Sequence, residues 1–431
     1  MGDISRKSAL LVGNGFSINF DSDFANIYDR LIEGHKYLLE NVVHDYISDS
    51  YKIWGENNYN KILQTLKGFN QDSFDRMFND AILFAGFIVN NAKVKEKIKN
   101  HKAFSSTSFG FTILTVIESI YKTGKNNGYK SVNIENWTVL VWVHYILFEL
   151  REEEYYKLYL SGNVFIELLW SSDIINLEST KNDPNSFVTI NSMFNGFIIY
   201  YKDLMAATIF NSGKSIDMEK LGKLNNLNLS KIKEFTDRFD ILMTLNYDHI
   251  LENVTDRKVE HLHGKFEINK EVFVNFQKQS FNNEISTINY SSIQIGDYLF
   301  YKTILSTISN LGVAKDKRNK KLIMPTNAIP TLISEKSLNH IVIFGMNAEN
   351  DFHILRGIML GFSESNTLSS KVTYCYFTEE ERHSFEETWY RVITFGKEYS
   401  EYSRGIELEF VNSKEIINDH FLVKEIVKGK F

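Results

Sequence analysis

The pattern of hydrophobic and polar residues predicts six short strands. Residues 9–12 form a continuous apolar run that ends at Gly13, which is typical of a strand buried on both faces. After residue 238, similar runs alternate with helical patterns, at residues 239–245, 258–262, 340–344, 372–377 and 406–411. Strands that alternate with helices predict a parallel sheet covered by helices on both faces.

The intervening region, residues 24–237, has helical spacing instead. Phe74, Phe78, Ile82 and Ala85 recur every three or four residues after Asp72, a candidate helix cap. Comparable patterns cover residues 106–122, 135–160 and 189–210. The sequence therefore predicts an α/β fold with a Rossmann-like parallel sheet and a large all-helical insertion after the first strand. The expected domains are residues 1–23 plus 238–431 for the α/β part and 24–237 for the helical part.

Composition narrows the function classes. The 431 residues are 43% hydrophobic and 14% aromatic. The net charge is -6, and acidic and basic residues are interspersed, so the sequence has no basic patch of the kind that binds nucleic acid. The longest apolar stretch, residues 138–150, is too short to span a bilayer and predicts a buried helix. Cys375 is the only cysteine, which excludes an intramolecular disulfide and a four-cysteine zinc module. Since no signal-peptide pattern opens the chain, we expect a cytoplasmic protein without membrane contact.

A glycine-rich turn follows the first predicted strand, at Gly13-Asn14-Gly15-Phe16-Ser17. The glycines permit a tight turn and close approach of a ligand, and the amides after them can face a pyrophosphate. Ile18 replaces the third glycine of the dinucleotide fingerprint, which disfavours an ordinary dehydrogenase. An unliganded strand-to-helix turn is the alternative.

Small polar residues follow the second strand, at Thr244-Leu245-Asn246-Tyr247-Asp248. Asn246 can donate and accept hydrogen bonds to ribose hydroxyls or a water molecule, and Asp248 can accept them. The alternative is a helix start capped by Asn246 or Asp248.

Two more loops carry candidate chemistry. His263-Gly264 offers an imidazole suited to proton transfer near neutral pH, whereas His261 is expected to face the opposite side of the strand. We therefore expect one functional histidine and predict no metal ligands. Gly345, Asn347 and Asp351 lie in a turn after a later strand, which is either a ligand loop or an ordinary capped helix start.

Together these loops resemble the motifs of the sirtuin-like NAD-binding family, in its divergent bacterial NAD-hydrolase branch. Residues 13–17 are similar to the family's Gly-Ala-Gly-Ile-Ser turn, residues 244–248 to its Thr-Gln-Asn-Ile-Asp loop, and His263-Gly264 to its catalytic His-Gly. Residues 345–351 are similar to a Gly-x-Ser loop with a downstream Asp, with Asn347 in place of the Ser. Asp23-Phe24 resembles the Asp-Phe-Arg of sirtuins, with Ala25 in place of the Arg. The resemblance covers the opening turn and about residues 240–411.

The resemblance implies hydrolysis of NAD to nicotinamide and ADP-ribose, as a regulated effector of bacterial antiviral defence. Asn246 would position the ribose or the attacking water, and His263 would act as general base. NAD would be the substrate, and no structural zinc is expected because deacylating sirtuins use four cysteines for theirs. Homo-oligomers and a HerA-like ATPase are the expected partners. The implied NAD contacts are Gly13, Asn14, Gly15, Phe16, Ser17, Asp23, Thr244, Tyr247, Asp248, Gly264, Gly345, Asn347 and Asp351.

Other functions fit the same residues. The pocket would also suit a sensor of NAD or ADP-ribose, or an NAD-dependent protein deacylase. A helical scaffold with a vestigial sheet is a further alternative, and it predicts no thermal stabilisation by NAD.

Overall fold

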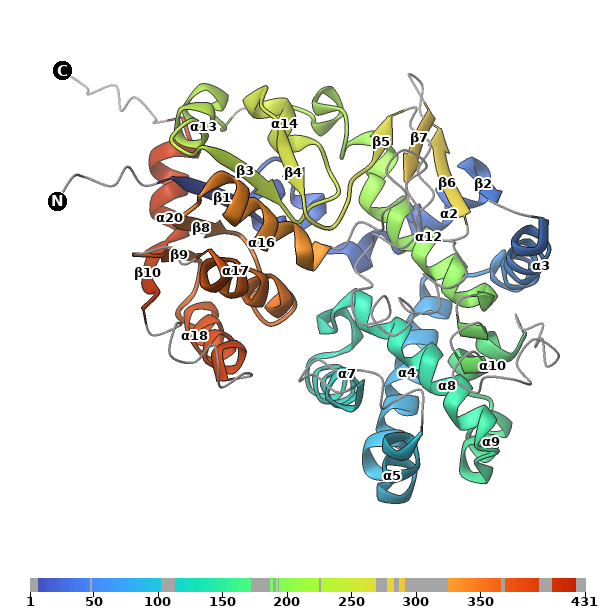
Figure 1. Cartoon of the computed structure of the whole chain (residues 1–431). Helices are drawn as coiled ribbons and strands as arrows, with labels where there is room; N and C mark the ends of the chain where they lie inside the picture. Colours follow the sequence, from blue (N-terminus) through green and yellow to red (C-terminus); the bar gives the residue numbers. More distant parts are fainter. Residues whose placement is uncertain are drawn as a thin grey trace, which may run out of the picture. The chain divides into compact units, whose positions relative to one another are not determined.

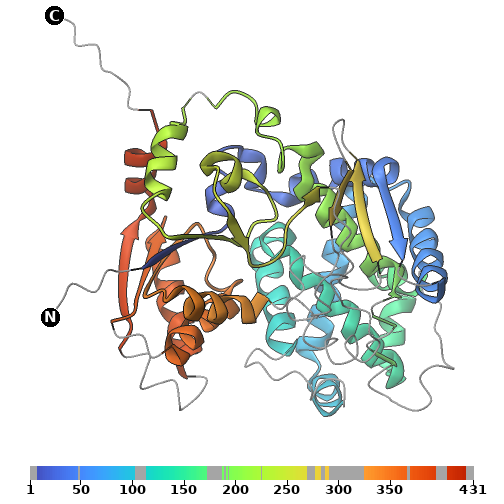
Figure 2. The same ribbon diagram turned by 45° about the horizontal axis from the view of Figure 1, so that its top comes forward.

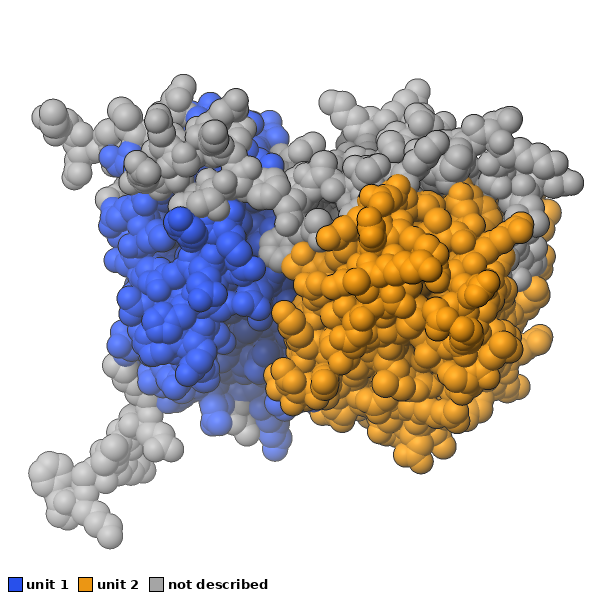
Figure 3. Space-filling model, turned by 90° about the horizontal axis from the view of Figure 1, so that it is seen from below, with its two compact units in different colours: residues 1–27, 209–266, 323–431 blue, residues 28–208, 267–322 orange. Residues whose placement is uncertain are grey.

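The computed structural model describes residues 7–46, 49–101, 113–171, 187–188, 191–192, 194–224, 226–268, 277–282, 287–290, 325–365, 369–394 and 405–423. The chain divides into two compact units, each described by itself (Figure 3). Unit 1 comprises residues 1–27, 209–266 and 323–431, and unit 2 comprises residues 28–208 and 267–322.

Unit 1 is built on a six-stranded sheet with the order β10-β9-β8-β1-β3-β4 (Figure 1). Every neighbouring pair in it is parallel, as the sequence predicts. Each strand lies at a predicted apolar run, which confirms an α/β fold with a parallel sheet. The strands are β1 (Ser8–Val12), β3 (Ile241–Thr244), β4 (Val259–His261), β8 (His340–Phe344), β9 (Lys371–Tyr376) and β10 (Glu407–Asn412).

Helices cover both faces of this sheet (Figures 1 and 2). On one face, Leu10, Val12 and Phe344 belong to a hydrophobic core that includes residues of α13 (Leu229–Thr236), α14 (Ile250–Thr255) and η8 (Ile417–Phe421). On the other, Tyr374 stacks on Phe385 of α18 (Glu379–Thr394), with ring centroids 4.1 Å apart. The remaining elements are α1 (Asn14–Ser17), η1 (Ser22–Phe24), η5 (Asn211–Gly213), η6 (Met218–Leu221), α16 (Pro325–Lys336), α17 (Phe352–Glu364) and α20 (Ser413–Ile416).

Unit 2 is mainly helical, but the prediction that the inserted region is all-helical is wrong. β2 (Val42–Tyr46) lies within the predicted helical block and joins β6 (Gln277–Asn282), β7 (Thr287–Tyr290) and β5 (Glu267–Ile268) in a four-stranded sheet. β2 pairs with β6, more than 200 residues later, so no local pattern could reveal its partner. The helices are η2 (Ile27–Arg30), α2 (Leu31–Asn41), α3 (Asp49–Leu66), α4 (Gln71–Asn90), α5 (Ala92–Asn100), α7 (Ile113–Asn127), η3 (Tyr129–Ser131), η4 (Ile134–Asn136), α8 (Trp137–Glu149), α9 (Glu153–Leu160), α10 (Val164–Ser171) and α12 (Gly196–Phe210).

The unit boundaries also differ from the predicted ones. Unit 1 resumes at residue 209 rather than 238, because η6 and α13 pack with the α/β core, and residues 267–322 belong to unit 2. The predicted helix 135–160 is two helices, α8 and α9, and part of the predicted helix 106–122 lies outside the described residues. The apolar stretch forms a buried helix, as expected: α8 is buried from Trp137 to Leu147. None of the described helices has the length and apolarity that crossing a membrane requires.

Candidate functional site at the carboxyl ends of the parallel strands

Four of the predicted ligand loops begin at the same level of the unit 1 sheet. Val12 pairs in register with both Thr244 and Phe344, and Thr244 pairs with His261. The loops after β1, β3, β4 and β8 therefore leave the sheet at one edge. From β1 the chain continues to β3 and β4 on one side and later returns to β8 on the other. In open parallel sheets, this change of direction marks the crevice where ligands bind.

The loops after β1 and β8 pack backbone against backbone. Gly13 N–H donates to the Phe344 carbonyl at 2.9 Å, and Gly15 N–H donates to the Gly345 carbonyl at 2.9 Å. A Cβ atom on Gly345 would lie 2.6 Å from Gly15 Cα, and Gly345 has φ +69°. Glycine at these positions is therefore explained by close loop packing as well as by any ligand.

This packing changes the expected role of the glycine-rich turn. The Phe16 amide donates to the Gly13 carbonyl at 3.0 Å, so the amides of Gly13, Gly15 and Phe16 all have partners within the fold. The Phe16 ring is buried beside Phe20, and Asn14 Nδ2 donates to the Phe24 carbonyl at 2.7 Å. The amides of Gly13, Gly15 and Phe16 are thus not presented to a pyrophosphate, contrary to the sequence interpretation.

Asn246, Ser17 and Asp248 form a hydrogen-bonded chain next to this turn. Asn246 Nδ2 donates to the Gly13 carbonyl at 3.1 Å and to Ser17 Oγ at 2.9 Å, and Ser17 Oγ donates to Asp248 Oδ2 at 2.6 Å. A carbonyl can only accept, which fixes the orientation of the Asn246 amide. Burial raises the pKa of Asp248 to about 6, although the hydrogen bonds from Ser17 and the Ile250 amide oppose this rise. The structure thus brings these three polar residues together beside the turn, and their contact with NAD stays a prediction.

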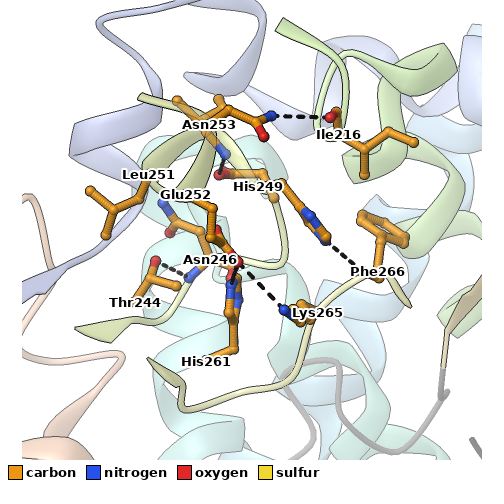
Figure 4. Close-up of polar contacts among 12 residues, drawn as sticks. Ile216, Thr244, Asn246, His249, Leu251, Glu252, Asn253, His261, Lys265 and Phe266 are labelled. Carbon is orange, nitrogen blue, oxygen red and sulfur yellow. Dashed lines mark hydrogen bonds and ion pairs between the residues drawn. The ribbon is translucent and has the colours of Figure 1, made fainter. Parts of the chain in front are cut away.

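A second hydrogen-bond network, around His261, supports the loop that carries Asn246 (Figure 4). His261 Nδ1 contacts the Asn246 carbonyl at 2.9 Å, and its Nε2 contacts Glu252 Oε1 at 2.7 Å. Burial disfavours the ionised Glu252, but the hydrogen bond and charge of His261 outweigh it and lower the Glu252 pKa. Both His261 nitrogens face acceptors, so the imidazolium form satisfies both contacts. His249 Nε2 contacts the Phe266 carbonyl and fixes the next turn of the loop.

Thr244 and Tyr247 shape the loop through its backbone. Thr244 Oγ1 accepts the Asn246 amide at 3.0 Å, and the Tyr247 carbonyl accepts the Phe266 amide at 3.2 Å. Both side chains are buried, and their contact with NAD stays a prediction.

His263 lies in a different group from His261, as strand alternation predicts. His263 Nε2 is 2.9 Å from Nε2 of His353, and the ligand atoms of His263, His353 and Asp351 all lie within 4.8 Å of one another. Burial lowers the pKa of His263 to about 4 and raises the pKa of Asp351 to about 7. His263 is therefore neutral near pH 7, the form a general base requires.

Asp23, Asn347 and Gly264, the other predicted NAD contacts, have structural partners or roles of their own. The Asp23 carboxylate pairs with Lys214 at 2.7 Å, as does that of Asp21. Asn347 is exposed, and its Oδ1 accepts the amides of Glu349 and Asn350, which fits a turn-capping role. Gly264 has φ +89° and lets the chain turn away directly after His263.

Sequence reasoning missed three residues of the site. Glu252 pairs with His261, Lys214 holds Asp21 and Asp23, and His353 contacts His263 from 90 residues away. The only local signal for His353 was its position two residues after Asp351, at the start of a helix behind a strand.

We compared the chain with protein-family models, curated proteins and solved structures. None of them matches it. The resemblance of the motifs to sirtuin-like proteins therefore stays a prediction, and the chemistry is argued from this chain's own residues.

Proposed function

We propose that this chain hydrolyses NAD to nicotinamide and ADP-ribose, on a sirtuin-like core with an inserted helical unit. The observation that carries the proposal is the register of β3 and β4. Thr244 pairs with His261, and Asn246 and His263 each follow two residues later at the same sheet edge. A polar amide and a neutral imidazole thereby leave adjacent strands beside the switch point of the sheet.

Asn246 is held in a form that suits water or ribose positioning. Both hydrogens of its amide nitrogen are used, by Gly13 and Ser17. Its Oδ1 has no donor among the described residues and is only partly buried. In the proposed reaction, Oδ1 accepts a hydrogen bond from the attacking water or from a ribose hydroxyl, and Ser17 and Asp248 keep the amide in place.

His263 supplies the general base. Its Nε2 lies against His353 Nε2, so its Nδ1 carries the available lone pair when Nε2–H is donated to His353. His353 is then a positioning residue that selects this tautomer. Such a base contributes on the order of 10²- to 10⁴-fold in rate.

The proposed reaction is a displacement at the ribose C1′ atom. The bond between C1′ and the nicotinamide nitrogen breaks, and its electron pair leaves with neutral nicotinamide. A water oxygen bonds to C1′, and the proton lost from that water passes to His263 and then to solvent. Because unrestrained loss of NAD would harm the cell, we expect the purified chain to have a basal activity that rises on assembly with further copies or with a defence partner such as a HerA-like ATPase.

Nicotinamide release from NAD tests this proposal. The parent chain is compared with Asn246→Ala and His263→Ala, with His383→Ala as control because its side chain is exposed on α18. We expect release by the parent and the control, and a loss of at least about 100-fold in both site variants, provided that each keeps the parent's melting temperature. Equal release by His263→Ala would exclude its role as base, and NAD binding without cleavage would favour the sensor.

A further inference from the structure

The group formed by His263, His353 and Asp351 is more than the proposed hydrolysis requires. One imidazole is enough for a general base, yet a second imidazole and a carboxylate converge on it from the loop and helix that follow β8. His353 is only 4% exposed, in the first turn of α17. We propose that these three side chains bind one divalent transition-metal ion of the Zn²⁺ class.

The distances fit a shared ion. Nitrogen atoms bound to one ion at about 2.0–2.1 Å lie about 2.9 Å apart at right angles and about 3.3 Å apart in a tetrahedron. The two Nε2 atoms are 2.9 Å apart, and one ligand atom from each of the three residues lies within 4.8 Å of the others. Shifts of a few tenths of an ångström in the imidazoles, with a larger adjustment of the carboxylate, complete the coordination.

The position of Asp351 is the second observation. It occupies the N-cap of α17, where an aspartate side chain ordinarily accepts a backbone amide of the first turn. Here its side chain makes no such capping bond. The carboxylate lies beside the two imidazoles instead, where a bound cation would offset the cost of burying its charge.

The donor set defines the class of ion. Imidazole nitrogens suit Zn²⁺, Fe²⁺, Ni²⁺ and Co²⁺, whereas Mg²⁺ and Ca²⁺ prefer oxygen ligands. Two imidazoles and one carboxylate also leave coordination positions open for water or a ligand. The site thus differs in its donor atoms from a four-cysteine structural zinc module.

Metal binding has a consequence for the proposed hydrolase, although the inference does not depend on that function. A metal on His263 Nε2 leaves the proton of the neutral imidazole on Nδ1. No lone pair then remains to accept a proton, so the bound ion and the general base exclude each other. Under the proposed function, Zn²⁺ is therefore an inhibitor.

Zn²⁺ titration of the chelator-treated full chain, followed by calorimetry, tests the site without NAD. We expect one Zn²⁺ per chain in the parent and in the control His383→Ala, and at least about 100-fold weaker binding in Asp351→Asn and His353→Ala. Asp351→Asn is nearly isosteric, so it keeps the test valid if His353→Ala fails to fold. Co²⁺ should give the visible absorption of a protein-bound ion in the parent, and millimolar Mg²⁺ should not displace it.

Two results would overturn the inference: no Zn²⁺ binding by the parent, or equal binding by the parent and Asp351→Asn. Nicotinamide release is measured separately in the presence of chelator. Zn²⁺ binding without NAD cleavage would support the metal site and refute the proposed hydrolase. NAD cleavage without Zn²⁺ binding would support the hydrolase and refute the metal site.

Discussion

Replacing Gly345 by alanine tests how the loops after β1 and β8 are held together. The substitution has two costs: its φ of +69° is unfavourable for alanine, and its new Cβ would lie 2.6 Å from Gly15 Cα. The left-handed backbone costs about 1 kcal/mol. Backbone atoms cannot turn aside as a flexible side chain can, so overpacking adds about 2 kcal/mol. We expect Gly345→Ala to lower the free energy of unfolding by about 3 kcal/mol.

Three glycines in the chain separate the two costs. Gly162 has φ +80°, and a Cβ there would make only an ordinary contact, 3.9 Å from Glu167 Oε1, so Gly162→Ala should cost only about 1 kcal/mol. Gly15 has the close contact without a positive φ, so Gly15→Ala should cost about 2 kcal/mol. Gly68 has neither feature, so Gly68→Ala should leave stability unchanged or slightly raised.

Thermal unfolding followed by circular dichroism measures this series. For a unit of this size, 1 kcal/mol corresponds to about 2–4 °C, so Gly345→Ala should melt about 6–12 °C below the parent. The comparison that decides is Gly345→Ala against Gly162→Ala. Equal melting temperatures would show that backbone strain accounts for the whole effect and that the two loops do not pack together.

Two further predictions concern the supports of the site. Burial raises the pKa of Asp248 to about 6 from 3.8. Between these two pH values, the folded state therefore holds a proton on Asp248 that the unfolded state has released. The resulting stability is present below about pH 4 and is lost as the pH rises through 6, by up to about 3 kcal/mol. Urea unfolding at a series of pH values should show this decline in stability in the parent and in the exposed control Asp256→Asn, and a smaller decline in Asp248→Asn. Equal pH dependence of stability in the parent and in Asp248→Asn would contradict the argument. Arg257 donates to the carbonyls of three residues before β3, and Arg257→Lys should cost about 2 kcal/mol in the same assay because an ammonium cannot reproduce the guanidinium fork. Arg76→Lys, at an exposed site, should change stability by less than about 0.5 kcal/mol, and an equal effect of both substitutions would contradict this reading.

The unit 1 sheet could be predicted from sequence because its strands are buried on both faces. β1 and β8 are almost uninterrupted apolar runs, so each carries its own signal without its neighbours. β2 carries no such signal, since its assignment depends on pairing with β6 far along the chain. Its prediction as part of a helical block was wrong for that reason.

The site was predictable where polar residues directly follow a strand. Asn246 and Asp248 do so, and the structure joins them through Ser17. The expected phosphate contacts of the glycine turn could not be judged from sequence, because the Gly13 and Gly15 amides bond to Phe344 and Gly345, more than 300 residues later. His353 was missed because it lies among the apolar residues of α17, and a histidine in such a pattern is typical of a core position.

The central claim, hydrolysis of NAD at the ribose carbon, is tested most directly by mass spectrometry of the products after incubation of the purified full chain with NAD. The account predicts equimolar nicotinamide and ADP-ribose, and at least about 100-fold less of both from Asn246→Ala. Intact NAD after prolonged incubation, or nicotinamide released without ADP-ribose, would contradict it.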